Sequence, residues 1–163
     1  MIPITTYSPE LDRLLPTTAS LLKITRWQVH PAVLRVILIG SRGLNGHPRP
    51  DSDIDLSLIV DPALLPAAEP EREQFLRAVI ETTLNSWHGP VELDTAAPFG
   101  SLEALQMFSV REVDAALVAA CAPHIGLYKL QKGFSGYVPP HLLEWRKLYP
   151  LLTIWERSMV EGV

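Results

Sequence analysis

Two stretches decide the fold: Ile37-Leu38-Ile39-Gly40-Ser41-Arg42-Gly43 and, after a short interval, Asp51-Ser52-Asp53-Ile54-Asp55-Leu56. The first completes an apolar run over residues 33–39 that is rich in β-branched residues and stops at a glycine, which predicts a buried strand. Residues 53–60 alternate polar and apolar side chains, which predicts a second strand with one face in water. The intervening residues 41–52 hold glycines and prolines, which predict a loop with room for one short helical turn.

The rest of the chain supplies helices and further strands. We expect helices over residues 8–24, 69–87, 110–120 and 140–160, and strands over residues 91–96 and 125–130. Ser8 and Pro9 suit the start of the first helix, whereas Pro16 and Pro150 should interrupt the first and last helices. The order strand, loop, strand, helix, strand predicts an α+β (α/β-like) domain with a small mixed sheet flanked by helices.

Length and composition are those of one globular domain. The chain has 163 residues, of which 47% are hydrophobic and 20% are charged. We expect a single domain over 1–163, with a core near residues 25–100 and a C-terminal extension of helix and strand over 101–163. The net charge of −4 gives no basic excess for binding a nucleic acid backbone, and the single cysteine allows no internal disulfide.

The sequence shows no pattern of a secretory signal or a membrane span, which favours the cytoplasm. The N-terminus lacks a basic stretch followed by an apolar one, which is the pattern of a signal peptide. No apolar run in the sequence is long enough to span a bilayer. We therefore expect a cytoplasmic protein without a membrane partner.

The glycine turn and the acidic strand together indicate chemistry on phosphates. Gly40 has no side chain, so a phosphate group can approach the backbone closely, and the hydroxyl of Ser41 adds a hydrogen bond. A helical turn after Ser41 would point its free N–H groups at that phosphate. Asp53 and Asp55 lie two residues apart on a strand and so face the same side. Two such carboxylates repel each other unless a cation lies between them, and Mg²⁺ prefers oxygen ligands and substrate phosphates.

The same residues carry a family resemblance. Gly40-Ser41, followed after eleven residues by Asp53-Ile54-Asp55-Leu56, resembles the signature of the minimal nucleotidyltransferases. These are relatives of the DNA polymerase beta superfamily, including kanamycin nucleotidyltransferase and the antitoxins paired with HEPN-domain toxins. The stretch Arg49-Pro50-Asp51-Ser52 before the acids looks especially like that group. The resemblance covers residues 33–60 and, more weakly, 91–96.

The resemblance implies an activity and a ligand set. Family members transfer a nucleoside monophosphate to a hydroxyl and release pyrophosphate. The implied nucleotide-binding residues are Gly40, Ser41 and Arg42, and the implied metal ligands and catalytic acids begin with Asp53 and Asp55. Two Mg²⁺ ions about 3.5–4 Å apart would clamp the attacking and leaving oxygens. Many members carry a second arginine soon after Gly-Ser; this chain lacks it, and either Arg42 or Arg49 can replace its charge.

A third acid on a later strand completes the site in that family. Glu92 and Asp94 share one face of the strand predicted over residues 91–96. Asp94 parallels the first pair in spacing and side-chain length, so we expect it to be the third catalytic acid and metal ligand. Glu92 is the alternative third ligand, because Val-Glu-Leu also fits the family's pattern of an acid between apolar residues.

The partners implied are a nucleoside triphosphate and a hydroxyl acceptor, which is a protein, an RNA end or a small molecule. One alternative is an antitoxin-like regulatory partner of a HEPN-type toxin, and another is a nucleotide-binding protein without turnover. An apolar stripe on the helix predicted over 140–160 packs on the domain's own core or on a homodimer or helical protein partner. Its members are Trp145, Leu148, Leu152 and Trp155.

Overall fold

The computed structural model describes residues 1–99, 126–131, 134–138 and 152–161, and these residues form an α+β fold. The strands are β1 (Ile2–Pro3), β2 (Gln28–Val29), β3 (Val33–Ile39), β4 (Ile54–Val60), β5 (Leu93–Phe99), β6 (Gly126–Gln131), β7 (Phe134–Val138) and β8 (Leu152–Glu156). The helices are α1 (Pro9–Leu14), α2 (Pro16–Lys23), the short 3-10 helix η1 (Pro62–Leu64), α3 (Glu69–Ser86) and α6 (Ser158–Glu161).

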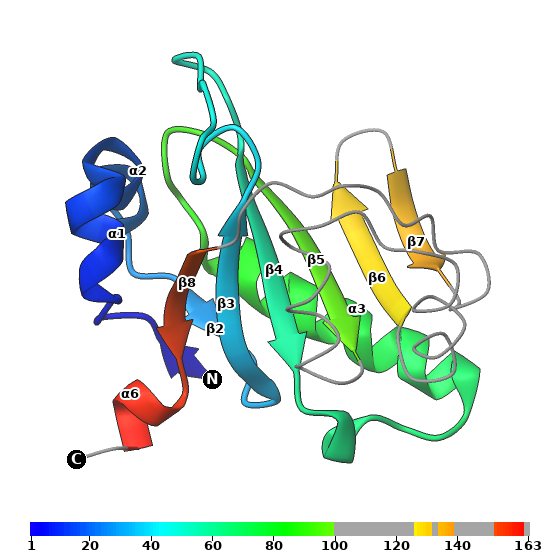
Figure 1. Cartoon of the computed structure of the whole chain (residues 1–163). Helices are drawn as coiled ribbons and strands as arrows, with labels where there is room; N and C mark the ends of the chain where they lie inside the picture. The colour runs from blue at the N-terminus through cyan, green and yellow to red at the C-terminus, as the bar shows by residue number, and fades with distance from the viewer. Residues whose placement is uncertain (100–125, 132–133, 139–151, 162–163) are drawn as a thin grey trace, which may run out of the picture.

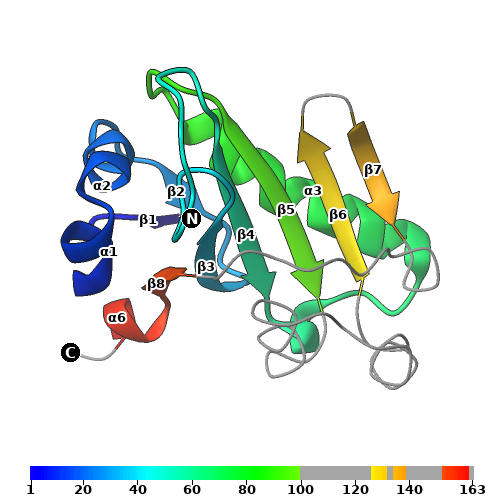
Figure 2. The same cartoon turned by 45° about the horizontal axis from the view of Figure 1, so that its top comes forward.

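The main sheet of the described residues has six strands in the order β7-β6-β5-β4-β3-β8, and β1 pairs with β2 separately. Strands β4 and β5 are parallel and are joined through α3, whereas the other neighbours in the sheet are antiparallel. Helix α3 lies across one face of the sheet, and α1 and α2 lie beyond the β8 edge (Figures 1 and 2). The sheet is therefore mixed, as the sequence predicts.

The core forms between α3 and the sheet because both elements carry apolar side chains on the facing side. In β4 the alternate residues Ile54, Leu56, Leu58 and Val60 are buried in one hydrophobic cluster. Leu76, Val79 and Ile80 of α3 belong to the same cluster. Asp55 and Ser57, which alternate with the buried residues of β4, are only partly buried. The period of two along the strand thus fixes which side chains are left for chemistry.

The sequence places most element boundaries of the N-terminal half correctly. The expected strand over 33–39 matches β3, and the expected helices over 8–24 and 69–87 match α1, α2 and α3. Pro16 divides the first helix as expected, because it begins α2. Strands β5 and β6 confirm the expected strands over 91–96 and 125–130. Strands β1, β2 and β7 were not expected, and the helix expected over 110–120 lies outside the described residues.

The closing helix expected over 140–160 is wrong for residues 152–156, which form strand β8 along the edge of β3. The sequence Leu152-Thr153-Ile154-Trp155-Glu156 mixes β-branched and aromatic residues, which suit a strand, and it pairs with an otherwise open sheet edge. Helical spacing alone misjudged this stretch because a short apolar run fits either period. Residues 139–151 lie outside the described part of the chain.

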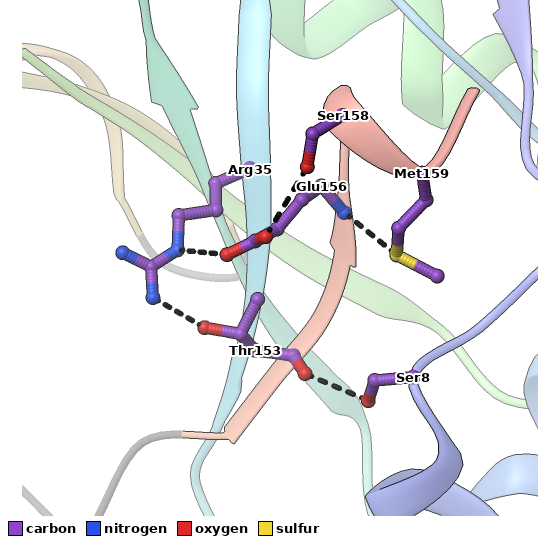
Figure 3. Close-up of polar contacts among 6 residues, drawn as sticks. All are labelled: Ser8, Arg35, Thr153, Glu156, Ser158 and Met159. Carbon is purple, nitrogen blue, oxygen red and sulfur yellow. Dashed lines mark hydrogen bonds and ion pairs between the residues drawn. The ribbon is translucent and has the colours of Figure 1, made fainter. Parts of the chain in front are cut away.

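Side chains on both sides of β8 hold it in place (Figure 3). Arg35 of β3 donates from Nη2 to the hydroxyl of Thr153 at 2.6 Å, and its Nε lies 3.5 Å from a carboxylate oxygen of Glu156. The hydroxyl of Ser8 donates to the carbonyl of Thr153 at 2.8 Å. Ser8 occupies the N-cap position of α1, as expected from the sequence. Its hydroxyl, however, bonds to β8 and does not cap the N–H groups of the helix.

Trp155 is fully buried in the core of the domain, together with Ile154. Of the two alternatives for the apolar stripe, packing on the domain's own core is the one that holds for Trp155. Trp145 and Leu148 lie outside the described residues. In the part of the chain that the structure describes, no helix has the length and apolar character needed to cross a membrane.

Candidate functional site

The candidate site lies at the end of the sheet where β3 stops and β4 and β5 begin. The loop between β3 and β4 projects from this end of the sheet (Figure 1). Ile39, the last residue of β3, is paired with Asp55 of β4, and Asp55 is in turn paired with Asp94 of β5. Three neighbouring strands therefore meet at the point where the acidic residues lie.

Asp55 and Asp94 are register partners on two parallel strands, so their side chains lie next to each other on the same face of the sheet. Leu93 and Thr95, on either side of Asp94, are buried on the opposite face. Asp53 lies one residue before β4 and is partly buried. Glu92 lies one residue before β5; its side chain is exposed, and its carbonyl accepts from the backbone N–H of Ile54 at 2.9 Å.

The carboxylates influence one another electrostatically. Burial, and then the neighbouring charges of Asp94 and Asp53, raise the pKa of the Asp55 carboxyl to about 6. Both causes disfavour the ionised form of Asp55. A cation at this position would favour the ionised form of Asp55, because an opposite charge offsets the repulsion from Asp94 and Asp53.

The glycine turn is packed against this cluster. Gly40 has a φ of +79°, and a Cβ at this position would overlap the carboxylate of Asp55. The N–H of Gly43 donates to the carbonyl of Gly40, and that of Gly46 donates to the carbonyl of Gly43. Residues 41–52 form turns without a helix, so N–H groups of a helical turn are not available here. The glycine at 40 therefore makes room for Asp55, a role beyond the phosphate approach expected from sequence.

A polar hollow of about 320 Å³ opens at this end of the sheet. Its lining residues are Ser41, Arg49, Asp51, Ser52, Asp53, Asp55 and Asp94. The expected residues Ser41, Asp53, Asp55 and Asp94 are thus brought together, while Glu92 does not line the hollow. Asp51 and Ser52 were not predicted as site residues, and Arg49 was named only as one of the two arginines that can replace the missing charge. Their position directly before the acidic strand was the signal that could have identified them.

Arg42, expected to bind nucleotide, is buried with 4% of its surface exposed and does not line the hollow. Its guanidinium donates to three backbone carbonyls: those of Ser52 at 2.6 Å, Arg49 at 3.0 Å and Pro50 at 3.2 Å. Of the two arginines that can replace the missing charge, Arg49 is the one that lines the hollow.

The donor set suits a hard divalent cation that arrives with its substrate. Carboxylate oxygens are the ligands that Mg²⁺ prefers, and Mg²⁺ usually binds through one or two carboxylates together with substrate phosphates and waters. The described residues contain no group of three or more His, Cys, Asp or Glu side chains arranged to hold a metal ion. The acids therefore fit an ion whose remaining ligands come from the substrate better than an ion enclosed by protein alone.

No protein-family model, no curated protein and no solved structure matches this chain. The functional conclusion therefore depends on the geometry of the site and on the sequence motif.

Proposed function

We propose that this protein is a Mg²⁺-dependent nucleotidyltransferase, which transfers a nucleoside monophosphate from a nucleoside triphosphate to a hydroxyl acceptor. The observation that carries the proposal is the pairing of Asp55 with Asp94 beside Asp53, in a polar hollow that the glycine turn borders. Burial and the neighbouring acids raise the pKa of Asp55, and a carboxyl group perturbed in this way within a polar hollow is typical of a functional site.

Each side of the hollow has a distinct task in this proposal. Asp53, Asp55 and Asp94 would supply carboxylate ligands to Mg²⁺ only together with the triphosphate oxygens, since the described acids alone form no three-ligand metal group; the ion would neutralise charge and polarise the phosphoryl oxygens. Ser41 would donate a hydrogen bond to a phosphate oxygen. Arg49, which lines the same hollow, would bind a further phosphate oxygen through its guanidinium and offset its charge. The protein thus acts mainly by positioning and by electrostatic stabilisation, as expected for phosphoryl transfer.

The proposed reaction is an in-line displacement at the α-phosphorus. The acceptor oxygen forms a bond to that phosphorus while the bond to the bridging oxygen of the β-phosphate breaks, so pyrophosphate leaves. The proton of the acceptor hydroxyl passes to a carboxylate, for which Asp94 is the candidate base. The all-polar lining suits the triphosphate and metal, and the nucleobase and acceptor would bind outside it.

Product analysis tests this proposal without knowledge of the acceptor. Purified protein is incubated with each nucleoside triphosphate, with and without Mg²⁺, and water serves as a slow substitute acceptor. We expect Mg²⁺-dependent release of pyrophosphate together with the nucleoside monophosphate, and loss of that release in Asp53→Asn. Release of inorganic phosphate and nucleoside diphosphate in its place would mean attack at the γ-phosphorus and would exclude nucleotidyl transfer.

A further inference from the structure

Arg42 is a buried cation, and its side-chain hydrogen bonds to the described residues go to the backbone of one turn. Its Nε donates to the carbonyl of Ser52, and its Nη2 donates to the carbonyls of Arg49 and Pro50. No ion pair joins Arg42 to a carboxylate within the described residues. A charged group is costly to bury, so these three charge-assisted hydrogen bonds are the interactions that offset its desolvation.

The turn over residues 49–52, to which Arg42 donates these hydrogen bonds, is part of the loop that lines the hollow. The N–H of Ser52 donates to the carbonyl of Arg49 at 3.0 Å, and the N–H of Arg49 donates to the hydroxyl of Ser52 at 2.7 Å. Arg49, Asp51 and Ser52 all line the hollow, and the next residue along the chain is Asp53. The position of this turn therefore determines where Asp53 and Arg49 face, and Arg49 is the one cation among the described residues that line the hollow.

Arg42 is itself held from the other side. The hydroxyl of Thr18, in helix α2, donates to the backbone carbonyl of Arg42 at 2.8 Å in a buried position. The turn over 49–52 is thus connected through Arg42 to a helix of the domain core. Without this connection the turn would be held chiefly by its own internal hydrogen bonds and by the start of β4.

We propose that Arg42 is a positioning residue, which holds the turn over residues 49–52 so that Arg49 and Asp53 face the hollow, and that it makes no contact with the triphosphate. This inference rests on the proposed function and goes beyond it, because it assigns the two arginines different tasks. The planar guanidinium presents its donors in a rigid fork that reaches several carbonyls at once, a geometry that the compact ammonium on a flexible lysine stem does not reproduce.

The test compares Arg42→Ala, Arg42→Lys and Arg49→Ala with the unaltered protein. Mg²⁺-dependent affinity for nucleoside triphosphates is measured by calorimetry, and amide hydrogen exchange is followed over residues 49–55. We expect Arg42→Ala to weaken binding about tenfold or more and to speed exchange in the turn without nucleotide. Millimolar guanidinium should restore both properties in Arg42→Ala, and Arg42→Lys should be intermediate. Ile80→Val, a core change far along the chain in α3, controls for lost stability alone.

The outcomes separate the inference from the proposed function. If the unaltered protein binds no nucleoside triphosphate with Mg²⁺, the proposed function fails and the inference falls with it. If the unaltered protein binds but Arg42→Ala binds equally well, only the inference is overturned. If Arg42→Ala binds weakly but the amides of residues 49–52 exchange as slowly as in the unaltered protein, Arg42 contacts the ligand directly. That result also overturns the inference. In Arg49→Ala we expect weak binding with unchanged exchange in the free protein. Should Arg42→Ala fail to fold, Arg42→Lys decides by the same two measurements.

Discussion

Gly40 and Asp55 are in such close contact that a methyl group on residue 40 would overlap the Asp55 carboxylate. Gly40 also has a φ of +79°, a conformation that side chains rarely adopt. The glycine that ends β3 and the acid in β4 therefore depend on each other. A side chain at residue 40 cannot be accommodated unless that carboxylate moves.

Gly40→Ala should consequently damage the site as well as the fold. We expect a loss of about 1–3 kcal/mol in the free energy of unfolding, from the unfavourable φ and the overlap. We also expect the stabilisation by Mg²⁺ and nucleoside triphosphate to disappear, because the Asp55 carboxylate is displaced. Denaturant unfolding with and without both ligands measures both effects. Ile80→Val should cost about 0.5–1.5 kcal/mol yet keep the response to ligands, and a Gly40→Ala protein that kept it too would contradict this role.

Stability without metal should depend on pH through Asp55. Its pKa in the folded protein is raised to about 6 from an ordinary 3.8, so the folded state holds this proton more tightly than the unfolded state does. The contribution of this proton to the free energy of unfolding is fully present below about pH 3.8 and is lost as the pH rises through about 6. In Asp55→Asn this loss should be absent. Unfolding curves between pH 4 and 8 in chelator test this, and identical pH profiles for the two proteins would refute it.

The choice between Asp94 and Glu92 gives a matched pair of variants. Asp94 lines the hollow beside Asp55, its register partner, whereas the Glu92 side chain is exposed and does not line the hollow. We expect Asp94→Asn to weaken Mg²⁺-dependent binding of nucleoside triphosphate at least tenfold, since a charged ligand is lost. Glu92→Gln should change that affinity less than twofold. Calorimetric titration compares them, and a reversed order would make Glu92 the third ligand.

Trp155 provides a test of the fold at the β8 edge. Because its side chain is fully buried, Trp155→Ala should lower the free energy of unfolding by about 3–5 kcal/mol. Val160, in α6 and 48% exposed, is the control, and Val160→Ala should cost under about 0.5 kcal/mol. Chemical denaturation gives both values. A small effect for Trp155→Ala would contradict the burial of this side chain. It would favour the alternative in which Trp155 lies on an exposed helix face that binds a partner.

The sequence predicts the elements around the site well because the periodicity of their apolar residues agrees with the residues at their ends. Residues 33–39 and 53–60 have strand patterns that end at glycine or begin with aspartate, and β3 and β4 match them nearly residue for residue. The strand over 152–156 was missed because β8 is stabilised by pairing with β3, which is distant in the sequence. The β-branched and aromatic residues of this stretch suit a strand, but so short an apolar run also fits a helix, and the pairing with β3 decides between the two.

In the site, too, some residues could be predicted from local spacing or from a motif, whereas others depend on how the chain folds back on itself. Asp53 and Asp55 could be predicted to share a face because two-residue spacing along a strand fixes it. Asp94 was predicted as the third acid from the family resemblance, with Glu92 as the alternative, and the pairing of β4 with β5 places Asp94 beside Asp55. The separate places of Arg42 and Arg49 could not be predicted, because they depend on how the loop over residues 41–52 folds back on itself. Loop conformation follows from individual hydrogen bonds such as those of Arg42, and no periodic pattern encodes them.

Binding of Mg²⁺ and a nucleoside triphosphate, compared between the unaltered protein and the Asp53→Asn/Asp55→Asn double variant, is the most direct measurement. Thermal unfolding is recorded with each triphosphate at saturating concentration, with Mg²⁺ or with chelator. For the unaltered protein we predict a rise in Tm of about 5 °C or more with at least one triphosphate and only with Mg²⁺; for the folded double variant we predict none. No Mg²⁺-dependent rise with any triphosphate, or an equal rise in the double variant, would contradict a metal–triphosphate site at these acids.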